Sequence, residues 1–185
     1  RVESEGCSAH PTVGGGAFVA PHRVLTVAHV IAGADDVDVV LADGTEKTAV
    51  VVAIDRRKDL ALLDVDATIN PLRLGPLRIG ARGTFASWRS GTPRDVSFVA
   101  TEAVDIQSDD IDHVSTEVRH GYAIEADILP GDSGSVLVSD GRAVAVVFAR
   151  STHDHSTGWA TAADEVSAML TTAGDTAVDI GVCPT

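Results

Sequence analysis

The sequence has 185 residues, of which 44% are hydrophobic, so it is long enough for one compact globular domain with a sizeable core. There are 14 Lys and Arg against 27 Asp and Glu, and the resulting net charge of -13 argues against nucleic-acid binding. The longest apolar runs, such as 143–149, are far too short to cross a bilayer, so we expect no membrane helix in this chain.

Short runs rich in Val, Leu and Ile alternate with Gly, Pro and Asp, which is typical of an antiparallel β-protein. The first part of the chain predicts a barrel over about residues 12–66, with strands at 15–20, 23–27, 37–41, 45–54 and 60–65. The next segment contains Pro71, Gly75, Pro76 and Gly80 and is predicted to be a linker over about 67–80.

The second part of the chain shows the same alternation of apolar runs with Gly, Pro and Asp, and it predicts a second barrel over about residues 81–161. Its expected strands are 84–88, 96–104, 113–126, 135–139 and 142–148. Asp140-Gly141 is a strong hairpin signal between the last two. A capping-box-like stretch at 161–164, followed by apolar residues at helical spacing, predicts a terminal helix over about 162–173.

The two cysteines, Cys7 and Cys183, stand almost at opposite ends of the chain. If the termini meet, they can form a disulfide that is worth about 4–5 kcal/mol in the chain-entropy model. It would place the domain outside the cytoplasm; the alternative is two unrelated free thiols. The chain begins at Arg1 without a methionine or signal peptide, which we interpret as a mature product or an excised domain.

A tight polar turn, Gly131-Asp132-Ser133-Gly134, precedes a strand-like apolar run. Its glycines leave the Ser133 hydroxyl and the nearby backbone N–H groups open to a ligand. Such combinations also occur in ordinary turns, so the motif needs support from elsewhere in the chain.

Two polar residues beside apolar strands supply that support. His29 ends the predicted strand that begins at residue 23, and Asp59 comes directly before the apolar strand 60–65. A structural histidine and a strand-start cap are the ordinary interpretations of these residues. Together with Ser133, however, they supply the base, the orienting acid and the nucleophile, and a serine hydroxyl needs the first two because alone it is a poor nucleophile.

The order of these residues along the chain discriminates between protease classes. His, Asp, Ser is the chymotrypsin order, whereas subtilisins run Asp, His, Ser and α/β-hydrolases run Ser, acid, His. An α/β-hydrolase would also need Gly-x-Ser-x-Gly, and Ser135 occupies the last position of that motif.

Residues 25–29 (Leu-Thr-Val-Ala-His), 59–63 (Asp-Leu-Ala-Leu-Leu) and 131–134 resemble the three signatures of trypsin/chymotrypsin-like serine proteases, with an HtrA-like character at 53–59. A closer similarity runs nearly end to end, to the extracytoplasmic domain of the actinobacterial membrane-anchored acid-resistance serine proteases; its segments are 16–24, 122–127 and 146–148, with both cysteines. The resemblance implies an all-β, chymotrypsin-like fold of two antiparallel six-stranded β-barrels with a short C-terminal helix. It also implies a terminal disulfide and a membrane anchor that is absent from this chain, and no PDZ module follows.

The resemblance also assigns roles to individual residues. Ser133 is the nucleophile, His29 the general base and then acid, and Asp59 the residue that holds the imidazole tautomer. The backbone N–H groups of Gly131 and Ser133 would form the oxyanion hole. A peptide substrate would lie extended along 148–150, which comprises Phe148, Ala149 and Arg150.

Cleavage preference rests on three further positions. Asp127 lies where trypsins keep the floor of the specificity pocket, and Gly158 resembles a pocket-wall glycine, which favours Lys or Arg before the cut bond. Arg150 falls where trypsins keep a glycine at the pocket mouth, so it either pairs with Asp127 or blocks entry. The acidity of the chain either adds a weak preference for cationic substrates or serves solubility alone.

The sequence departs from the family pattern in two places. Ser135 and Val136 replace the usual Gly-Pro after the serine motif, which adds bulk beside the nucleophile. There is no Ile-Val-Gly-Gly start, so we expect Asp132 to lack the ion pair that matures trypsinogens, with the disulfide as the hypothetical route of activation.

The loop His153-Asp154-His155 offers fewer ligands than a structural zinc site needs and is expected to be exposed, with pH sensing as a weaker hypothesis.

The sequence therefore predicts a monomeric serine endopeptidase that acts on protein or peptide substrates without a cofactor or metal. We expect it on the extracytoplasmic side, in a stress or envelope-maintenance role. The alternatives are an HtrA-like quality-control protease that lacks a PDZ module, and a catalytically silent protease-fold binding module in which Ser135 or Arg150 spoils the site.

Overall fold

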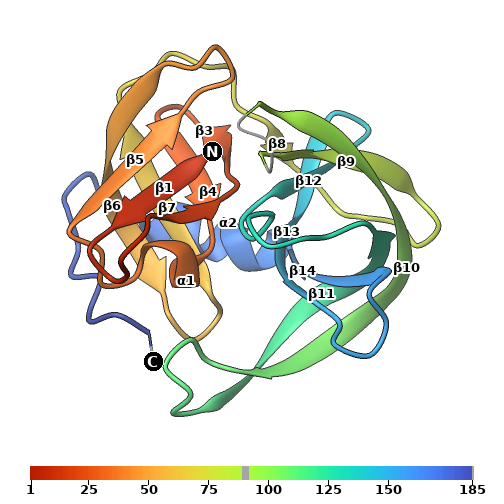
Figure 1. The fold of residues 1–185 in the computed structure, drawn as a ribbon. Helices are drawn as coiled ribbons and strands as arrows, with labels where there is room; N and C mark the ends of the chain where they lie inside the picture. Colours follow the sequence, from red (N-terminus) through yellow and green to blue (C-terminus); the bar gives the residue numbers. More distant parts are fainter. Residues whose placement is uncertain (89–91, 185) are drawn as a thin grey trace.

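The computed structural model describes residues 1–88 and 92–184, and two seven-stranded sheets make up most of this part of the chain (Figure 1). The first sheet comprises β1 (Val2–Glu5), β2 (Thr12–Gly14), β3 (Ala17–Ala20), β4 (Arg23–Thr26), β5 (Asp36–Val40), β6 (Glu46–Asp55) and β7 (Leu60–Val65). Its strand order is β2-β1-β5-β6-β7-β4-β3. A short helix, α1 (Ala28–Ile31), directly follows β4.

The second sheet comprises β8 (Arg73–Leu74), β9 (Arg82–Ser87), β10 (Arg94–Asp109), β11 (Thr116–Ala126), β12 (Val136–Ser139), β13 (Arg142–Arg150) and β14 (Thr157–Ala162). Its order is β12-β9-β10-β11-β14-β13-β8, and β12 also pairs with β13, so the sheet closes into a ring. Helix α2 (Ala163–Thr172) follows β14 directly.

The all-β architecture and the terminal helix expected from the sequence are confirmed, with differences in detail. Within the described residues each sheet has seven strands rather than six. Two strands in each sheet lie outside the strand ranges expected from the sequence, namely β1 and β2 in the first sheet and β8 and β14 in the second. The predicted strand 113–126 begins at Thr116, and the capping box at 161–164 does not form, since α2 begins without a side-chain cap.

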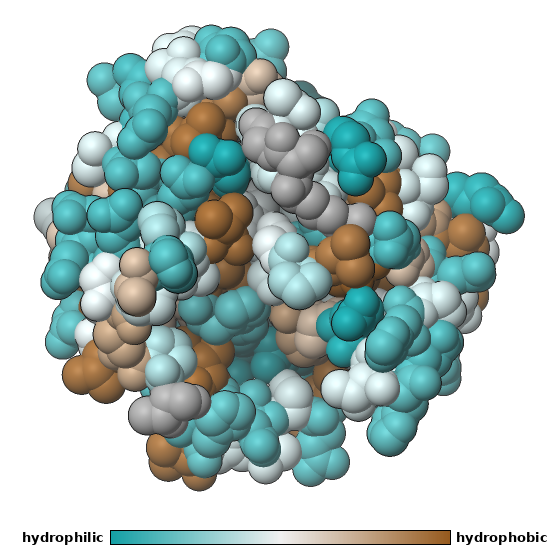
Figure 2. Space-filling model, viewed as in Figure 1, coloured by the Kyte–Doolittle hydropathy of each residue, from teal (hydrophilic) through white to brown (hydrophobic). Residues whose placement is uncertain are grey.

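One apolar cluster joins the two sheets. It contains Leu62 and Leu63 of β7, Val146 of β13 and Val166 of α2, each at most 1% exposed. A second cluster, around Phe85 and Phe98, fills the ring of the second sheet. Polar residues dominate the face shown in Figure 2, and its apolar side chains lie in small separate patches.

The β10–β11 hairpin reaches from the second sheet to the first. Its strands pair as far as Asp109 opposite Thr116, with a register shift between Ala100 and Glu102. In the turn beyond them, the Ile111 N–H donates to the Arg56 carbonyl, which directly follows β6 of the first sheet. Ile111 packs against Ala28 and Ala32, so the hairpin tip contacts α1 and the residue that follows it. Among the described residues, no helix has the length and apolar composition needed to span a bilayer.

Candidate active site

His29 and Asp59 form a two-point hydrogen-bonded pair. The Asp59 Oδ2 lies 2.7 Å from Nδ1 of His29, and its Oδ1 accepts the His29 backbone N–H at 2.8 Å. The Asp59 carboxylate is 5% exposed and the imidazole is 32% exposed, so one face of the ring stays open to a ligand. Because Oδ2 faces Nδ1, the tautomer protonated at Nδ1 is favoured and Nε2 is left free to accept a proton.

Local structure explains why these two residues meet. The sequence predicted that His29 ends a strand, but the chain instead turns into α1, which places the backbone N–H of His29 toward the β6–β7 turn. In that turn Asp55 accepts the N–H groups of Arg57 and Lys58. Asp59 follows with a left-handed φ of 53°, a strained conformation for a non-glycine residue that functional sites often hold.

Ser133 lies in the loop between β11 and β12, at the boundary of the two sheets (Figure 1). Its carbonyl accepts the Gly15 N–H at 2.7 Å. A Cβ built on Gly14 would lie 2.7 Å from the Ser133 carbonyl oxygen and 2.8 Å from a methyl of Val30. The serine loop and helix α1 therefore both pack against Gly14. The structure thus brings the Ser133 loop against the helix that carries His29.

The Ser133 hydroxyl makes no hydrogen bond to any described residue. A hydrogen bond between this hydroxyl and the imidazole of His29 would require a side-chain adjustment.

Two backbone donors beside Ser133 are free. Within the described parts of the chain, the N–H groups of Gly131 and Ser133 donate to no acceptor, although the neighbouring Asp132 N–H bonds to Leu129 and the Gly134 N–H bonds to Val147. Gly131 has a φ of 94°, which only glycine adopts without strain. Two free N–H groups on one tight turn can bind the oxyanion of a tetrahedral intermediate.

The buried carboxylate of Asp132 braces this turn. Its Oδ1 accepts the Ser87 hydroxyl at 2.6 Å and its Oδ2 accepts the Leu129 N–H at 2.9 Å. The amino group of Arg1 donates to the Val40 carbonyl of β5, in the first sheet. The Ser87 hydroxyl and the Leu129 N–H therefore hold Asp132. In trypsinogens, the aspartate at the corresponding position is held by a freed amino terminus.

A hollow of about 330 Å³ opens beside Ser133. Its apolar wall comes from Ile128, Leu129, Pro130, Val147 and Ala149, and its polar wall from Arg150, Ser151, Thr152 and His155. Arg150 Nη1 donates to the Ile128 carbonyl at 3.3 Å, which holds this cation at the edge of the hollow.

The remaining pocket residues are arranged differently from the trypsin pattern. Asp127 is exposed and lines a separate hollow of about 510 Å³, together with Glu125 and Arg82. Gly158 is buried, but a Cβ on it would lie 2.0 Å from Cδ1 of Ile128, so the isoleucine side chain occupies the space beside the glycine. Of the specificity residues predicted from the sequence, Arg150 and Ala149 lie beside Ser133, whereas Asp127 does not.

The other predicted residues also have definite places. Phe148 is half-buried, and its ring packs on the guanidinium of Arg119 at 4.5 Å. His153 and His155 lie in an exposed loop that Asp154 organises by accepting bonds from Ser156 and Thr157. The described residues contain no group of three or more His, Cys, Asp or Glu side chains that is placed to hold a metal ion.

Ile128, His155 and Arg119 adjoin the site but were not among the residues predicted from the sequence. Nothing in a single sequence marks an apolar residue before a turn or an arginine within a strand as part of a site.

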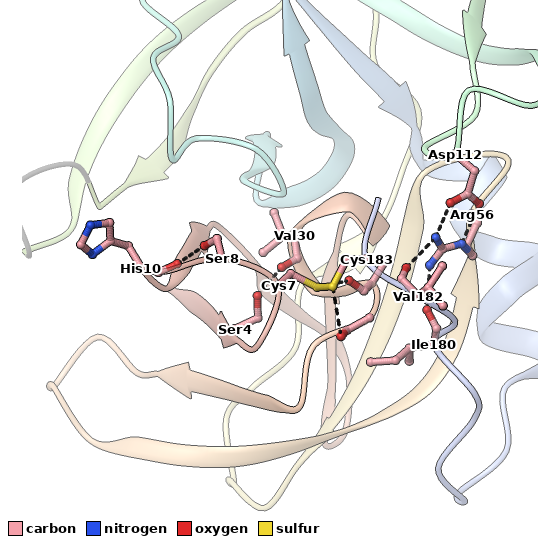
Figure 3. Close-up of a disulfide and its surroundings, with 12 residues drawn as sticks. Ser4, Cys7, Ser8, His10, Val30, Arg56, Asp112, Ile180, Val182 and Cys183 are labelled. Atoms are coloured by element: carbon pink, nitrogen blue, oxygen red, sulfur yellow. Dashed lines mark hydrogen bonds and ion pairs between the residues drawn. A yellow bond between two sulfur atoms is a disulfide. The ribbon is translucent and has the colours of Figure 1, made fainter. Parts of the chain in front are cut away.

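The predicted disulfide is present between Cys7 and Cys183 (Figure 3). It closes a loop over a sequence separation of 176. The Cys7 sulfur lies 3.3 Å from the Ala32 carbonyl, directly after α1, so the cross-link covers the end of the helix that carries His29.

A family model for the trypsin-like peptidase domain matches residues 14–146. The chain belongs to this family of trypsin-like peptidases. Among characterised members, it is 34% identical over 181 residues to the serine protease Rv3671c of Mycobacterium tuberculosis, which covers 92% of this chain and 44% of that protein. It is also 46% identical over 59 residues to the chloroplastic protease Do-like 1 of Arabidopsis thaliana, over 32% of this chain and 13% of that protein.

Solved structures of the family agree with this assignment. The crystal structure of the active form of the M. tuberculosis Rv3671c protease superposes with a TM-score of 0.93 at 30% identity, over 100% of this chain and 84% of that one. The inactive form of the same protease gives a TM-score of 0.77 over 94% of this chain and 88% of that one. The HtrA-type protease AlgW, at 23% identity and a TM-score of 0.74, shares the fold over 86% of this chain and 50% of that one. This trypsin-like chain spans less than half the length of its M. tuberculosis relative.

Proposed function

We propose that this trypsin-like domain is a serine endopeptidase that hydrolyses peptide bonds of protein substrates through Ser133, His29 and Asp59. The observation that carries the proposal is the two-point bond between Asp59 and His29, which fixes both the ring and the tautomer. The free N–H groups of Gly131 and Ser133 support it, because acyl transfer needs donors aimed at the developing oxyanion.

Each group has one step in the proposed reaction. His29 Nε2 takes the proton of the Ser133 hydroxyl as Oγ attacks the scissile carbonyl, and the oxyanion forms against the two free N–H groups. Asp59 stabilises the imidazolium through Nδ1. The imidazolium then gives its proton to the leaving amine, and an acyl-enzyme remains on Oγ. Water, deprotonated by the same imidazole, releases the acid and restores the serine.

The comparison with two forms of one relative supports a competent resting site. The chain is more similar to the active form of the Rv3671c protease than to its inactive form, with TM-scores of 0.93 and 0.77. The free oxyanion donors agree with this similarity, since a collapsed serine loop would use them in internal hydrogen bonds. We therefore propose that the domain is active without cleavage of a pro-segment.

Substrate preference follows from the hollow beside Ser133. The Lys or Arg preference predicted from the sequence needs Asp127 at the base of this hollow, whereas Asp127 is exposed in another one. Ile128 and Val147 make the hollow apolar, and Arg150 would repel a cationic side chain at its edge. We propose that the residue before the cut bond is uncharged and of small to medium size, with the peptide extended along Phe148, Ala149 and Arg150.

The location and the role of the domain are proposed from less specific observations. The disulfide agrees with an oxidising compartment, so we place the domain on the extracytoplasmic side, membrane-tethered in the longer protein. We propose a monomer in a stress or envelope-maintenance role, with protein substrates and no nucleic-acid partner. An HtrA-like quality-control protease is the alternative within the enzyme class.

The alternative outside the enzyme class is a silent binding module. In the sequence, the bulk of Ser135 beside the nucleophile is one reason to consider a silent binding module. The side chain of Ser135 is buried, however, and its hydroxyl donates to the Ala86 carbonyl at 2.9 Å, away from the turn. Because this residue is accommodated within the second sheet, it gives no reason for a misassembled site.

Reaction with a fluorophosphonate probe, followed by intact mass, tests the proposed function. We expect one adduct on the purified chain and none on Ser133→Ala. Asp59→Asn should slow labelling by about 10⁴-fold, because the amide favours the wrong tautomer of His29. If no adduct forms while the disulfide is intact, the silent binding module replaces the protease. Peptides that differ only before the cut bond test the preference, and faster cleavage after Lys or Arg would contradict it.

A further inference from the structure

Arg119 of β11 is a buried cation outside the proposed triad. It is 2% exposed and is the largest fully buried side chain among the described residues. Nη1 donates to the Lys58 carbonyl at 2.7 Å, Nη2 donates to the Ser108 hydroxyl at 2.6 Å, and Nε has no partner in the described part of the chain. The guanidinium also stacks on the ring of Phe148, 4.5 Å from its centre.

These contacts place Arg119 directly behind the catalytic pair. The Lys58 carbonyl belongs to the peptide group that leads into Asp59, whose φ of 53° turns its carboxylate toward His29. A hydrogen bond to this carbonyl restricts rotation of that peptide. Because β11 belongs to the second sheet and Asp59 to the first, the bond also ties the acid to the sheet that carries Ser133.

Four carboxylates from different elements act on Arg119. Asp59 is the carboxylate that acts on it most strongly, followed by Asp55 of β6, Glu165 of α2 and Glu117 of β11. Two of these have other partners, since Lys58 pairs with Glu165 and Arg57 pairs with Glu117. Burial lowers the pKa of Arg119 from its ordinary value, and the neighbouring carboxylates oppose that change.

A neutral side chain would fill this position at a lower cost in free energy, because an arginine with an unpaired Nε is expensive to bury. The positive charge therefore calls for an explanation beyond packing. We propose that Arg119 is a positioning residue for the catalytic pair, because it fixes the turn that carries Asp59 and keeps a buried positive charge near that carboxylate. This inference rests on the proposed function for the roles of the pair.

The charge has a definite consequence for His29. A fixed cation near the pair disfavours the imidazolium that forms during the reaction, so the charge affects the pH dependence of the rate. Loss of the cation is therefore expected to move the acid limb of the pH profile upward. Loss of the hydrogen bond alone loosens Asp59 and lowers the rate without moving the limb.

Arg119→Gln and Arg119→Lys separate the two effects. Gln keeps a donor without charge, and we expect the acid limb of probe labelling to rise by about one pH unit and the rate at neutral pH to fall about tenfold. Lys keeps the charge and should leave the limb within about 0.3 unit of wild type. The exposed Arg142→Gln, in β13, is the matched control and should leave both the limb and the rate unchanged.

The proton NMR signal of the His29 Nδ1–H provides a readout that does not depend on hydrolysis. Its chemical shift reports on the bond between Nδ1 and Asp59, so the inference can stand even if wild type fails to react with the probe, an outcome that would overturn only the proposed function. An unchanged Nδ1–H signal in Arg119→Gln, or equal changes in the Gln and Lys variants, would overturn the inference. Failure of both variants to fold would also overturn it, since Arg119 would then be a requirement of the fold.

Discussion

Ile128 and Gly158 fit together beside Ser133. The glycine leaves room for the isoleucine, whose Cδ1 lies where a Cβ on residue 158 would have to be. In the trypsin pattern the same glycine gives a long substrate side chain access to Asp127. Here the space is filled from within the protein, so an acid at the expected sequence position does not imply a basic substrate.

Ile128→Ala should deepen the hollow and change the preference of the enzyme. We expect kcat/KM for peptides with Phe before the cut bond to rise about tenfold relative to Ala, at a cost of about 2–3 kcal/mol in the free energy of unfolding. Gly158→Ala is the matched probe of the same contact. It should destabilise the wild-type chain but be tolerated together with Ile128→Ala, and strictly additive stability changes would contradict the proposed fit.

The tip of the β10–β11 hairpin links the two sheets at the scale of elements. Nε and Nη2 of Arg56 donate to the carboxylate of Asp112, and Nη1 and Nη2 donate to carbonyls of the C-terminal segment. Ile111 packs against Ala28 of α1 and against Ala32, the residue that follows the helix. The tip thus touches the β6–β7 turn and the helix that carries His29, and Arg56 links that turn to the C-terminal segment.

Ile111→Ala should therefore weaken α1 more than the rest of the fold. We expect a loss of about 2 kcal/mol in the free energy of unfolding, with faster amide hydrogen exchange in residues 28–32. Val114→Ala, at a position on the same turn that is 83% exposed, is the control and should have no measurable effect. Equal protection of α1 in the two variants would show that the hairpin tip does not support the helix.

Asp110 gives the same turn a pH dependence. It accepts the N–H groups of Val114 and Ser115 and the Ser115 hydroxyl, and these bonds lower the pKa of the carboxyl from 3.8 to about 2. Because the folded pKa lies below the unfolded one, the stabilisation is complete above pH 4 and disappears as the pH falls toward 2. Asp110→Asn should be less stable than wild type at pH 7. In denaturant unfolding, that difference should shrink between pH 4 and pH 2, and a constant difference would contradict the assignment.

Much of the site could be predicted from the sequence because its residues are close to their strands. His29 follows an apolar run, Asp59 and Ser133 come shortly before one, and the order of the three residues selects one protease class. Helix α1 was missed because Val27, Val30 and Ile31 are good strand formers, and tertiary packing decided its conformation. The start of β11 was misplaced because Asp110 captures backbone donors over 112–115, a contact that periodicity does not reveal.

Contacts between the two sheets cannot be predicted from local sequence patterns. The lining of the hollow beside Ser133 depends on which of two adjacent residues, Asp127 or Ile128, faces it, and strand alternation cannot decide this where a strand ends. The role of Arg119 depends on the Lys58 carbonyl, which lies 61 residues away in the sequence. A single sequence carries no record of such a pair.

At the scale of the whole molecule, the two barrels share one apolar cluster that includes Val146 of β13 and Leu63 of β7. This continuity supports our proposal that residues 1–185 form a single domain. The chain ends reinforce the first barrel, since a Cβ on Gly33 would lie 2.2 Å from the backbone nitrogen of Cys183. The C-terminal segment therefore presses on the loop that follows α1 (Figure 3).

Removal of the disulfide in a Cys7→Ser/Cys183→Ser variant tests how far this closure matters. The chain-entropy model sets an upper limit of about 5 kcal/mol on the lost stability for a loop of this length. We expect less, because Arg56 still donates to the carbonyls of Ile180 and Val182 and keeps the segment in place. Denaturant unfolding of the variant, beside wild type under oxidising conditions, measures the difference.

Activity of the same variant decides whether the disulfide also activates the site. Probe labelling should be measured at a temperature at which unfolding curves show the variant to be fully folded, so that a slower rate reports on the site and not on a lost population. The cross-link covers the carbonyl end of α1, and its removal leaves His29 on a less restrained helix, so we expect labelling to slow by about tenfold. Full labelling by the folded variant would refute activation through the disulfide and leave the cross-link a purely stabilising role.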